Sequence, residues 1–248
     1  MGDVLEARGL TVRFGGLQAL RDLSLKIEAG ELVGIIGPNG SGKTTFVNAV
    51  TGTVPVTSGA VTLGGRRLNG LPPFRISRLG VGRTFQIMRP FGDMTVLDNV
   101  MVAALHARGA SLREASAAAS AQLEFVGLAD RAHVRPDDLP LPDRKKLELA
   151  QALVQQPRLL FLDEVNAGLS PSDVQSVMAL VRGVNASGVT VVVVEHVMRV
   201  IAGLCTRVVV LHHGERIADG PCERVMTDPA VVTAYLGRRY AQRAVTRT

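Results

Sequence analysis

A glycine-rich stretch near the N-terminal end of the chain has the residue types and spacing of a phosphate-binding loop. It reads Gly37-Pro38-Asn39-Gly40-Ser41-Gly42-Lys43-Thr44-Thr45 and matches the pattern G-x-x-x-x-G-K-[ST] in full. Glycines let the backbone aim its N–H groups inward, so such a loop and the helix that follows it bind phosphate oxygens. In this pattern Lys43 reaches the β and γ phosphates, and the Thr44 hydroxyl holds Mg²⁺. The competing interpretation, an ordinary glycine-rich turn before a helix, is disfavoured by the complete motif.

Two acidic residues at the end of an apolar segment are the second chemical candidate. Asp163 and Glu164 follow the run 158–162, which is typical of a buried strand. Phosphoryl transfer needs a metal ligand and a group that positions the attacking water. Asp163 is suited to hold Mg²⁺ and Glu164 to polarise that water. Because ligands collect at the carboxyl edge of an open α/β sheet, we expect both acids to face the phosphate loop.

Three further polar positions follow predicted strands. Gln86 comes after the run 79–85, and Glu195 and His196 come after the apolar run 189–194, which has the composition of a strand buried on both faces. The pair His212 and His213 has no other metal-ligating residues beside it, so we interpret it as the end of a strand.

The elements that must position these residues alternate between strands and helices. We expect strands over 9–14, 23–27, 32–36, 60–63, 79–86, 158–164, 189–194, 207–212 and 215–219. The segment 95–129 is alanine-rich with helical periodicity, and Thr95 and Ser111 are expected N-caps. A proline-rich break over 136–142 precedes a predicted helix over 147–154, and Ser170 with Pro171 opens another helix. The pattern predicts an α/β body with a helical insert.

Length and composition limit the number of domains and the broad class of protein. A chain of 248 residues forms one large domain or two small ones, and a hydrophobic content of 46% is ordinary for a globular protein. The formal charge of +6 includes four arginines in the last stretch, 238–248, and without them it would be +2. We therefore expect a solvated basic tail. The two cysteines lack the spacing of a zinc site, and no stretch resembles a signal peptide or a membrane span.

In order and spacing, these motifs resemble those of the ATPase subunits of ABC transporters, and the resemblance covers nearly the whole chain. Four stretches are more narrowly similar to the branched-chain amino acid importer group: 14–20, 81–86, 94–100 and the late stretch 228–232 with 234–237. Urea and amide importers have similar subunits. The resemblance implies a P-loop NTPase fold, with a RecA-like core sheet, an N-terminal antiparallel β subdomain and an inserted helical subdomain. It places the β subdomain and core in 1–86 and 156–237, the helical subdomain in 87–155 and the basic tail in 238–248, all within one nucleotide-binding domain.

The resemblance also implies roles for single residues. Phe14 would stack on adenine, although a buried strand aromatic is the alternative, and the loop residues 37–45 would bind ATP. Gln86 would contact Mg²⁺ and the attacking water, or else be an exposed loop residue. His196 would sense the γ phosphate and orient Glu164. The implied metal ligands are Thr44, Gln86 and Asp163.

One segment departs from the family pattern. A Leu-Ser-x-Gly-Gln signature normally begins the helix after the insert and caps the nucleotide held by a second subunit. The matching positions here are Leu139-Pro140-Leu141-Pro142-Asp143. Prolines at 140 and 142 remove a hydroxyl and N–H donors, and Asp143 adds a negative charge. Val165-Asn166 and Ser170 are lesser departures, which bear on the contact between subunits.

The leading expectation is an ATP- and Mg²⁺-dependent motor subunit, peripheral on the cytoplasmic face of the membrane. Its partners would be a second, signature-intact ATPase subunit in a heterodimer, membrane-spanning permease subunits and, indirectly, a solute-binding protein. A nucleotide-binding regulatory subunit with little turnover is the alternative from another class. A DNA-handling ATPase is disfavoured because the positive excess lies mainly in the tail, and we expect no nucleic acid partner.

Overall fold

The computed structural model describes residues 3–84, 90–108 and 110–236. Contacts between Cα atoms divide the chain into a first unit, Met1–Pro73 with Thr190–Thr248, and a second unit, Phe74–Val189. The predicted helical subdomain, 87–155, is a narrower segment inside the second unit. Its boundaries, and those of the basic tail, stay a prediction.

The first unit begins with an antiparallel sheet in the order β2-β1-β4-β5. Its strands are β1 (Asp3–Phe14), β2 (Leu17–Glu28), β4 (Ser58–Leu63) and β5 (Arg66–Arg67). The hairpin closes where Phe14 pairs with Leu17 across Gly15 and Gly16, as the sequence predicts. Both strands are longer than predicted because their pairing continues to Asp3 and Glu28. This hairpin places Phe14 at its tip.

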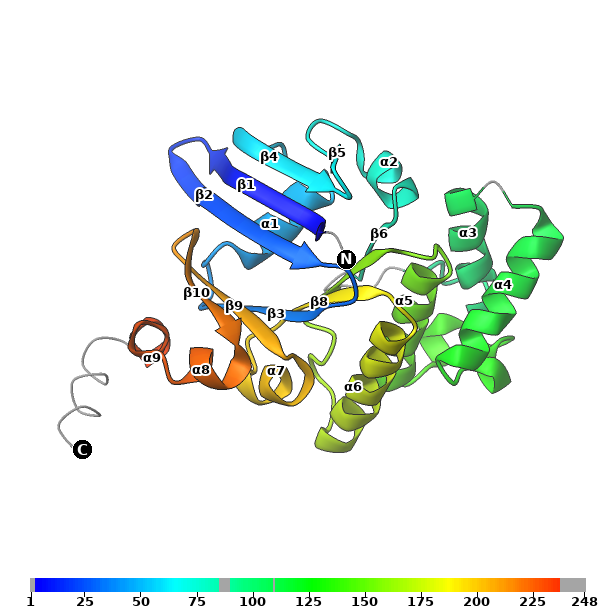
Figure 1. Cartoon of the computed structure of the whole chain (residues 1–248). Helices are drawn as coiled ribbons and strands as arrows, with labels where there is room; N and C mark the ends of the chain where they lie inside the picture. The colour runs from blue at the N-terminus through cyan, green and yellow to red at the C-terminus, as the bar shows by residue number, and fades with distance from the viewer. Residues whose placement is uncertain (1–2, 85–89, 109, 237–248) are drawn as a thin grey trace. The chain divides into compact units, whose positions relative to one another are not determined.

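The same unit contains parallel strands that lead to the phosphate loop. β3 (Leu32–Ile36) pairs in parallel with β8 (Thr190–Val194) and with β9 (Arg207–His212), and β10 (Glu215–Pro221) pairs antiparallel to β9. Every residue of β3 and β8 is buried. The unit's helices are α1 (Lys43–Val50), α7 (Met198–Leu204), α8 (Cys222–Met226) and α9 (Pro229–Leu236). In Figure 1 the antiparallel strands lie above β3, β9 and β10, and α7 and α8 lie below them.

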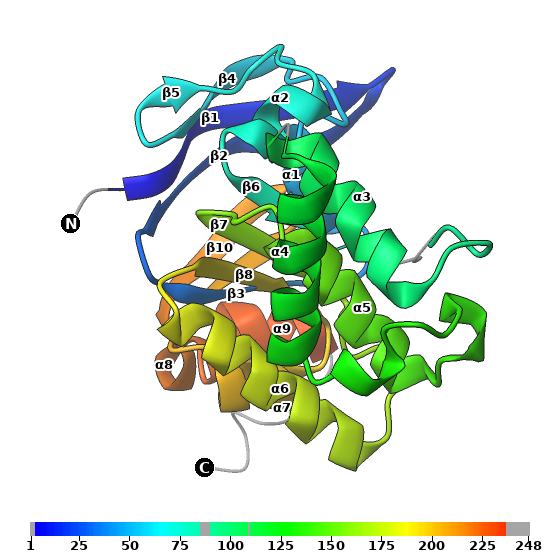
Figure 2. The same ribbon diagram turned by 90° about the vertical axis from the view of Figure 1, so that its right-hand side faces the viewer.

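The second unit combines a pair of parallel strands with most of the helices. β6 (Val81–Arg83) pairs with β7 (Leu159–Asp163), which is buried throughout. The helices are α2 (Pro73–Arg78), α3 (Val96–Arg108), α4 (Leu112–Phe125), η1 (Ala129–Arg131), η2 (Pro136–Asp138), α5 (Leu141–Leu153) and α6 (Pro171–Ala186). Helices α3, α4 and α5 pack on one another (Figure 2). The mixed α/β class is thus confirmed.

Helix starts follow local side-chain chemistry. Ser111 caps α4 in a capping box with Glu114, and the Thr95 hydroxyl accepts the Asp98 N–H at 3.1 Å before α3. Ser170 caps α6. The predicted start of the helix after the proline-rich break was wrong, because α5 begins at Leu141 and includes Pro142 in its first turn. Proline is tolerated there since the first N–H groups of a helix have no partner within it.

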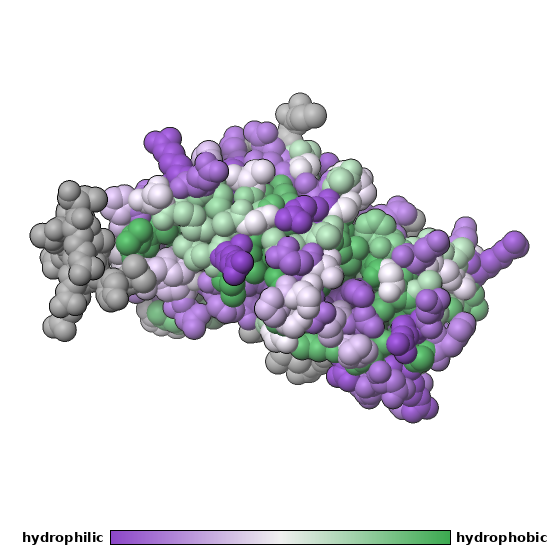
Figure 3. Space-filling view, turned by 90° about the horizontal axis from the view of Figure 1, so that it is seen from below, coloured by the Kyte–Doolittle hydropathy of each residue, from purple (hydrophilic) through white to green (hydrophobic). Residues whose placement is uncertain are grey.

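The described surface mixes polar and apolar residues. Seen from below, hydrophobic residues form patches between hydrophilic side chains that project outward (Figure 3). Across residues 3–84, 90–108 and 110–236, no helix combines the length and the apolar character needed to cross a membrane.

Candidate functional site

The phosphate loop connects β3 to α1 in a conformation that needs its glycines. A Cβ atom on Gly37 would overlap the carbonyl oxygen of Leu211. Gly42 has φ 106°, in the left-handed region, and a Cβ there would lie 2.8 Å from the carbonyl oxygen of Ala19. Gly42 is also the N-cap of α1. Because glycine alone avoids both the strain and the overlap, the loop can wrap tightly around the start of the helix.

Lys43 is folded back onto the loop. Its Nζ donates to the carbonyl oxygens of Gly37, at 2.7 Å, and Pro38, at 3.1 Å. The residue is 8% exposed. A buried ammonium needs such partners, since an unpaired charge away from water is costly. The Lys43 ammonium is therefore bound by carbonyl oxygens of the phosphate loop, the loop that is expected to bind phosphate oxygens.

The turn between β9 and β10 closes on the loop from the other side. The N–H of Gly214 donates to the carbonyl oxygen of Ser41 at 3.0 Å, and the carbonyl oxygen of Gly214 accepts from the N–H of Arg21 at 2.9 Å. A Cβ on Gly214 would lie 2.6 Å from the carbonyl oxygen of Ala19. This turn thereby fixes the loop and strand β2 to each other.

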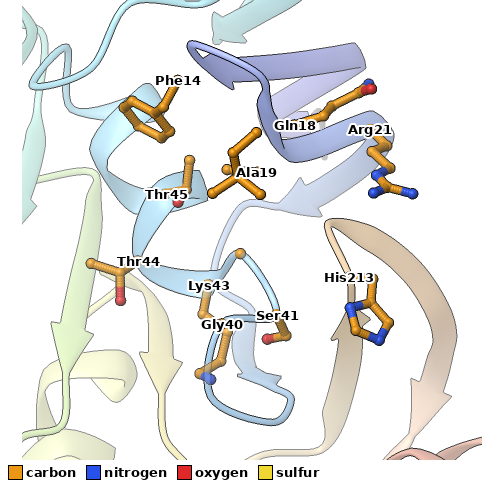
Figure 4. A pocket seen from close by; sticks show the side chains of 12 residues that line it. Phe14, Gln18, Ala19, Arg21, Gly40, Ser41, Lys43, Thr44, Thr45 and His213 are labelled. Carbon is orange, nitrogen blue, oxygen red and sulfur yellow. The ribbon is translucent and has the colours of Figure 1, made fainter.

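A pocket of about 300 Å³ lies between the hairpin tip and the phosphate loop. It is lined by Phe14, Leu17, Gln18, Ala19, Arg21, Gly40, Ser41, Gly42, Lys43, Thr44, Thr45 and His213. Figure 4 shows Phe14 on one side of the pocket and His213 on the other. Phe14 is 48% exposed, so the alternative that it is a buried strand aromatic was wrong. An aromatic face is available beside the loop.

Several pocket residues were not expected from the sequence. Gln18 and Arg21 lie on β2, after the hairpin turn that follows Phe14. They line the pocket beside the phosphate loop because the hairpin folds β2 back along β1. His213, interpreted as part of a strand end, lies in the β9–β10 turn with φ 48°. Its ring centroid is 4.1 Å from that of His212, and burial, followed by the effect of His213, lowers the pKa of His212. The signal that could have found His213 is its position directly before Gly214 in a turn.

His196 lies just beyond β8. Because β3 and β8 are parallel and Ile35 pairs with Val194, the segment after β8 leaves the sheet at the same edge as the phosphate loop. The His196 side chain is 52% exposed, and its Nδ1 atom lies 4.0 Å from Oε2 of Glu195, whose side chain is 2% exposed. Glu195 is therefore the buried carboxylate beside the predicted sensor, a role that its sequence position alone does not indicate.

In the second unit, Asp163 is the last residue of β7 and Glu164 follows it. Asp163 is 4% exposed, and its Oδ2 atom lies 3.3 Å from Nη2 of Arg83. The N–H of Asp163 donates to Oγ1 of Thr84 at 3.2 Å. Glu164 has φ 50°, a strained value for this residue type. The backbone thus turns sharply at the two acids predicted to act on the γ phosphate.

The predicted residues fall into three groups. The phosphate loop, Phe14 and His196 belong to the first unit, whereas Asp163 and Glu164 belong to the second. Gln86 lies outside the described residues. The structure therefore brings Phe14 and the loop together in one pocket, and it holds the two acids together at one strand end.

The donor groups suit a nucleotide with Mg²⁺. The pocket offers an aromatic face, the N-terminus of α1 and an ammonium, which match a base and phosphates. Thr44 contributes a hydroxyl to the pocket, and Asp163 a buried carboxylate to the second unit; oxygen ligands of this kind are those that Mg²⁺ prefers. The Oγ atom of Ser41 in the loop is buried and has no hydrogen-bond partner within the described part of the chain.

The segment that departs from the expected signature forms the start of α5. Pro140 is the N-cap and has no side-chain capping bond. Asp143 pairs with Lys146 at 2.8 Å, and Arg144 donates to the carbonyl oxygens of Leu139, at 2.8 Å, and Asp137, at 2.7 Å. The charged groups at this helix end are therefore engaged within the chain.

Comparisons with known proteins each match more than half of this chain. A family model described as ABC transporter matches residues 20–167. The sequence is 38% identical to the high-affinity branched-chain amino acid transport ATP-binding protein LivG of Salmonella typhimurium, over 94% of this chain and 98% of that protein. The fold is similar to the ADP conformation of MJ1267, an ATP-binding cassette of an ABC transporter, with a TM-score of 0.87, 27% identity and coverage of 96% and 100%. It is also similar to the dimeric post-hydrolysis state of the cassette MJ0796 bound to ADP and Pi, with a TM-score of 0.79, 27% identity and coverage of 88% and 98%.

Proposed function

Because the chain belongs to the ABC transporter family, we propose that it is the ATP-hydrolysing motor subunit of a membrane importer for branched-chain amino acids. The observation that carries the motor assignment is the pocket in which Phe14, Lys43 and Thr44 surround one space beside the phosphate loop. The solute class rests on the likeness to LivG, which extends over nearly the whole length of both chains. Urea, amides and other small solutes are the alternative cargo.

In the proposed mechanism, each residue does what its position allows. Phe14 stacks on adenine, while Lys43 exchanges the carbonyl oxygens of Gly37 and Pro38 for the β and γ phosphates. Thr44, Gln86 and Asp163 would hold Mg²⁺, which supplies charge neutralisation at the phosphates when bound. The mechanism requires the acids of the second unit to meet the loop of the first.

The remaining groups act on the nucleophile. Glu164 orients and polarises the attacking water, and His196, at the same sheet edge as the loop, contacts the γ phosphate and positions Glu164. Because the His196 side chain is half-exposed, it can adjust when a nucleotide arrives.

The subunit would work in a heterodimer at the cytoplasmic face of the membrane, with permease subunits and a solute-binding protein. In that dimer this chain lends α5 to the nucleotide of its partner. Pro140 supplies neither a hydroxyl nor an N–H, and Asp143 brings a carboxylate toward a polyphosphate. We therefore propose that the partner carries an intact signature, and that the nucleotide capped by this chain turns over poorly.

The proposal is tested by Glu164→Gln in a complex of the chain with its partner ATPase, permeases and binding protein in proteoliposomes. ATP hydrolysis and leucine uptake should fall by at least about a hundred-fold, the scale of a general base, while ATP binding is retained. Glu124→Gln, a matched change at an exposed position of α4, should alter neither. Uptake of urea or an amide in place of leucine would reassign the solute but leave the motor role intact.

The degenerate α5 start favours a second candidate, a nucleotide-binding regulatory subunit with little turnover. The same experiment separates the two functions. If Glu164→Gln leaves hydrolysis and uptake of the assembled complex unchanged, the chain binds nucleotide without hydrolysing it, and the motor assignment is wrong.

A further inference from the structure

Arg83 forms an ion pair with the predicted metal ligand. Its Nη2 atom lies 3.3 Å from Oδ2 of Asp163, and the two side chains are only 11% and 4% exposed. Removing two charges from water is costly, and their attraction offsets that cost only while both are present. The chain thus places a buried positive charge against the carboxylate that the proposed function gives to Mg²⁺.

Thr84, the next residue, forms hydrogen bonds with the backbone at the C-terminal end of β7. Its N–H donates to the carbonyl oxygen of Phe161 at 2.9 Å, and its Oγ1 accepts from the N–H of Asp163 at 3.2 Å. Arg83 pairs with Phe161 in the β6–β7 register. Arg83, the last residue of β6, therefore contacts the side chain of Asp163, and Thr84 directly after it contacts the backbone.

The distance between Arg83 and Asp163 suits a pair that can exchange partners. A tight arginine–carboxylate pair has N–O distances of about 2.7–2.9 Å and is often bidentate. The contact between Nη2 of Arg83 and Oδ2 of Asp163 is 3.3 Å, which is longer than this range. This contact is therefore weaker than a tight ion pair, which favours the exchange of Arg83 for a cation.

From these contacts we infer that Arg83 is a positioning residue that neutralises Asp163 in the metal-free protein and yields it to Mg²⁺ when the metal nucleotide binds. The inference rests on the proposed function, because it requires Asp163 to lie near the phosphates in the working state. Without metal, Arg83 keeps the Asp163 carboxylate from repelling them. With Mg²⁺ present, the metal supplies that positive charge itself.

The test measures binding, so that turnover does not enter. The affinity of the full-length protein for the non-hydrolysable analogue AMP-PNP is determined by calorimetry, once in EDTA and once in saturating Mg²⁺. For Arg83→Met, which keeps the length of the side chain but loses the charge, affinity in EDTA should fall more than affinity in Mg²⁺. The ratio of the two dissociation constants should rise by ~5-fold or more, the lower range of coupling between two ligands.

Two matched variants test whether the charge of Arg83, acting on the Asp163 carboxylate, causes the change in the ratio. Arg83→Lys retains a positive charge and should keep the ratio within about two-fold of the original protein. In a protein that already carries Asp163→Asn, adding Arg83→Met should leave the ratio unchanged, because no carboxylate is left to neutralise. If Arg83→Met alone fails to fold, Arg83→Gln, which also loses the charge, is measured in its place with the same expected rise in the ratio.

The outcomes are separable. An unchanged ratio in Arg83→Met, or an equal loss of affinity in EDTA and in Mg²⁺, would assign Arg83 a purely structural role and overturn the inference. A ~5-fold change on adding Arg83→Met to Asp163→Asn would overturn it as well. If the original protein binds no AMP-PNP in either condition, the proposed function itself fails.

Discussion

At the scale of single residues, Phe14 presents its ring at the tip of the hairpin. It is half-exposed, and its neighbours in the pocket are the loop residues that would hold phosphates. Exposure alone does not mark a binding site, since Phe125 is similarly exposed; it is the place of Phe14 in the pocket beside the phosphate loop that suits a flat ligand.

Replacing Phe14 by alanine should weaken ATP binding by roughly two- to ten-fold, because an aromatic contact of this kind contributes about 0.5 to 1.5 kcal/mol. Phe14→Tyr should retain most of the affinity. Calorimetric titration with ATP and Mg²⁺ measures both, and Phe125→Ala, at an equally exposed phenylalanine of α4, is the matched control. Equal affinities for Phe14→Ala and the original protein would remove Phe14 from the nucleotide site.

At the scale of elements, α7 packs closely against β3 at a glycine. A Cβ on Gly34 would lie 3.0 Å from Cγ2 of Ile201 and 3.4 Å from Sγ of Cys205, the residue that ends α7. Cys205 and Cys222 are both buried free thiols, as the sequence suggests. Burial raises the pKa of Cys205 to about 12, and the nearby Cys222 adds to the rise.

This raised pKa predicts a loss of stability in alkali. In the folded protein the Cys205 thiol stays protonated up to about pH 12, whereas in the unfolded chain it loses its proton above about pH 8.5. The unfolded state then binds fewer protons, so the free energy of unfolding falls as pH rises between these values. From pH 8 to pH 10 the contribution is about 1 to 2 kcal/mol.

Urea denaturation of the original protein and of Cys205→Ala at both pH values isolates this contribution. The alanine variant should be less stable at pH 8 but should lose less stability on going to pH 10. Parallel pH dependence of the two proteins would contradict the assignment, as would rapid labelling of both thiols by maleimide in the folded state.

At the scale of the whole molecule, the asymmetry proposed for the dimer makes a prediction about the isolated chain. ATP hydrolysis by the pure protein should be low and should increase on mixing with a signature-intact partner. The triple change Pro140→Ser, Pro142→Gly and Asp143→Gln should raise it by at least about ten-fold, since each donor to a charged phosphate is worth about 1.5 to 3 kcal/mol.

The control is Pro229→Ser, at an exposed proline that begins α9. It should leave the rate unchanged. Strong cooperative hydrolysis by the pure homodimer, with no response to the triple change, would contradict the asymmetric arrangement.

How much of this could be predicted depends on how local the determining contacts are. The phosphate loop and the caps Ser111 and Ser170 were predictable because each is set by residues within a few positions. The start of α5 was missed because a proline-rich sequence reads as a break, although Pro142 fits in a first turn. His213 and Arg83 were missed because their roles come from strand pairing between distant segments.

The β9–β10 turn that fastens Ser41 to Gly214 also has a consequence for biosynthesis. The ribosome makes the phosphate loop before β8 and β9, the partners of β3, which begin only at Thr190 and Arg207. A nascent chain that stops before residue 207 has the whole glycine-rich motif without the turn that closes on it. The loop therefore cannot take its folded form until β9 and the turn after it have also been made.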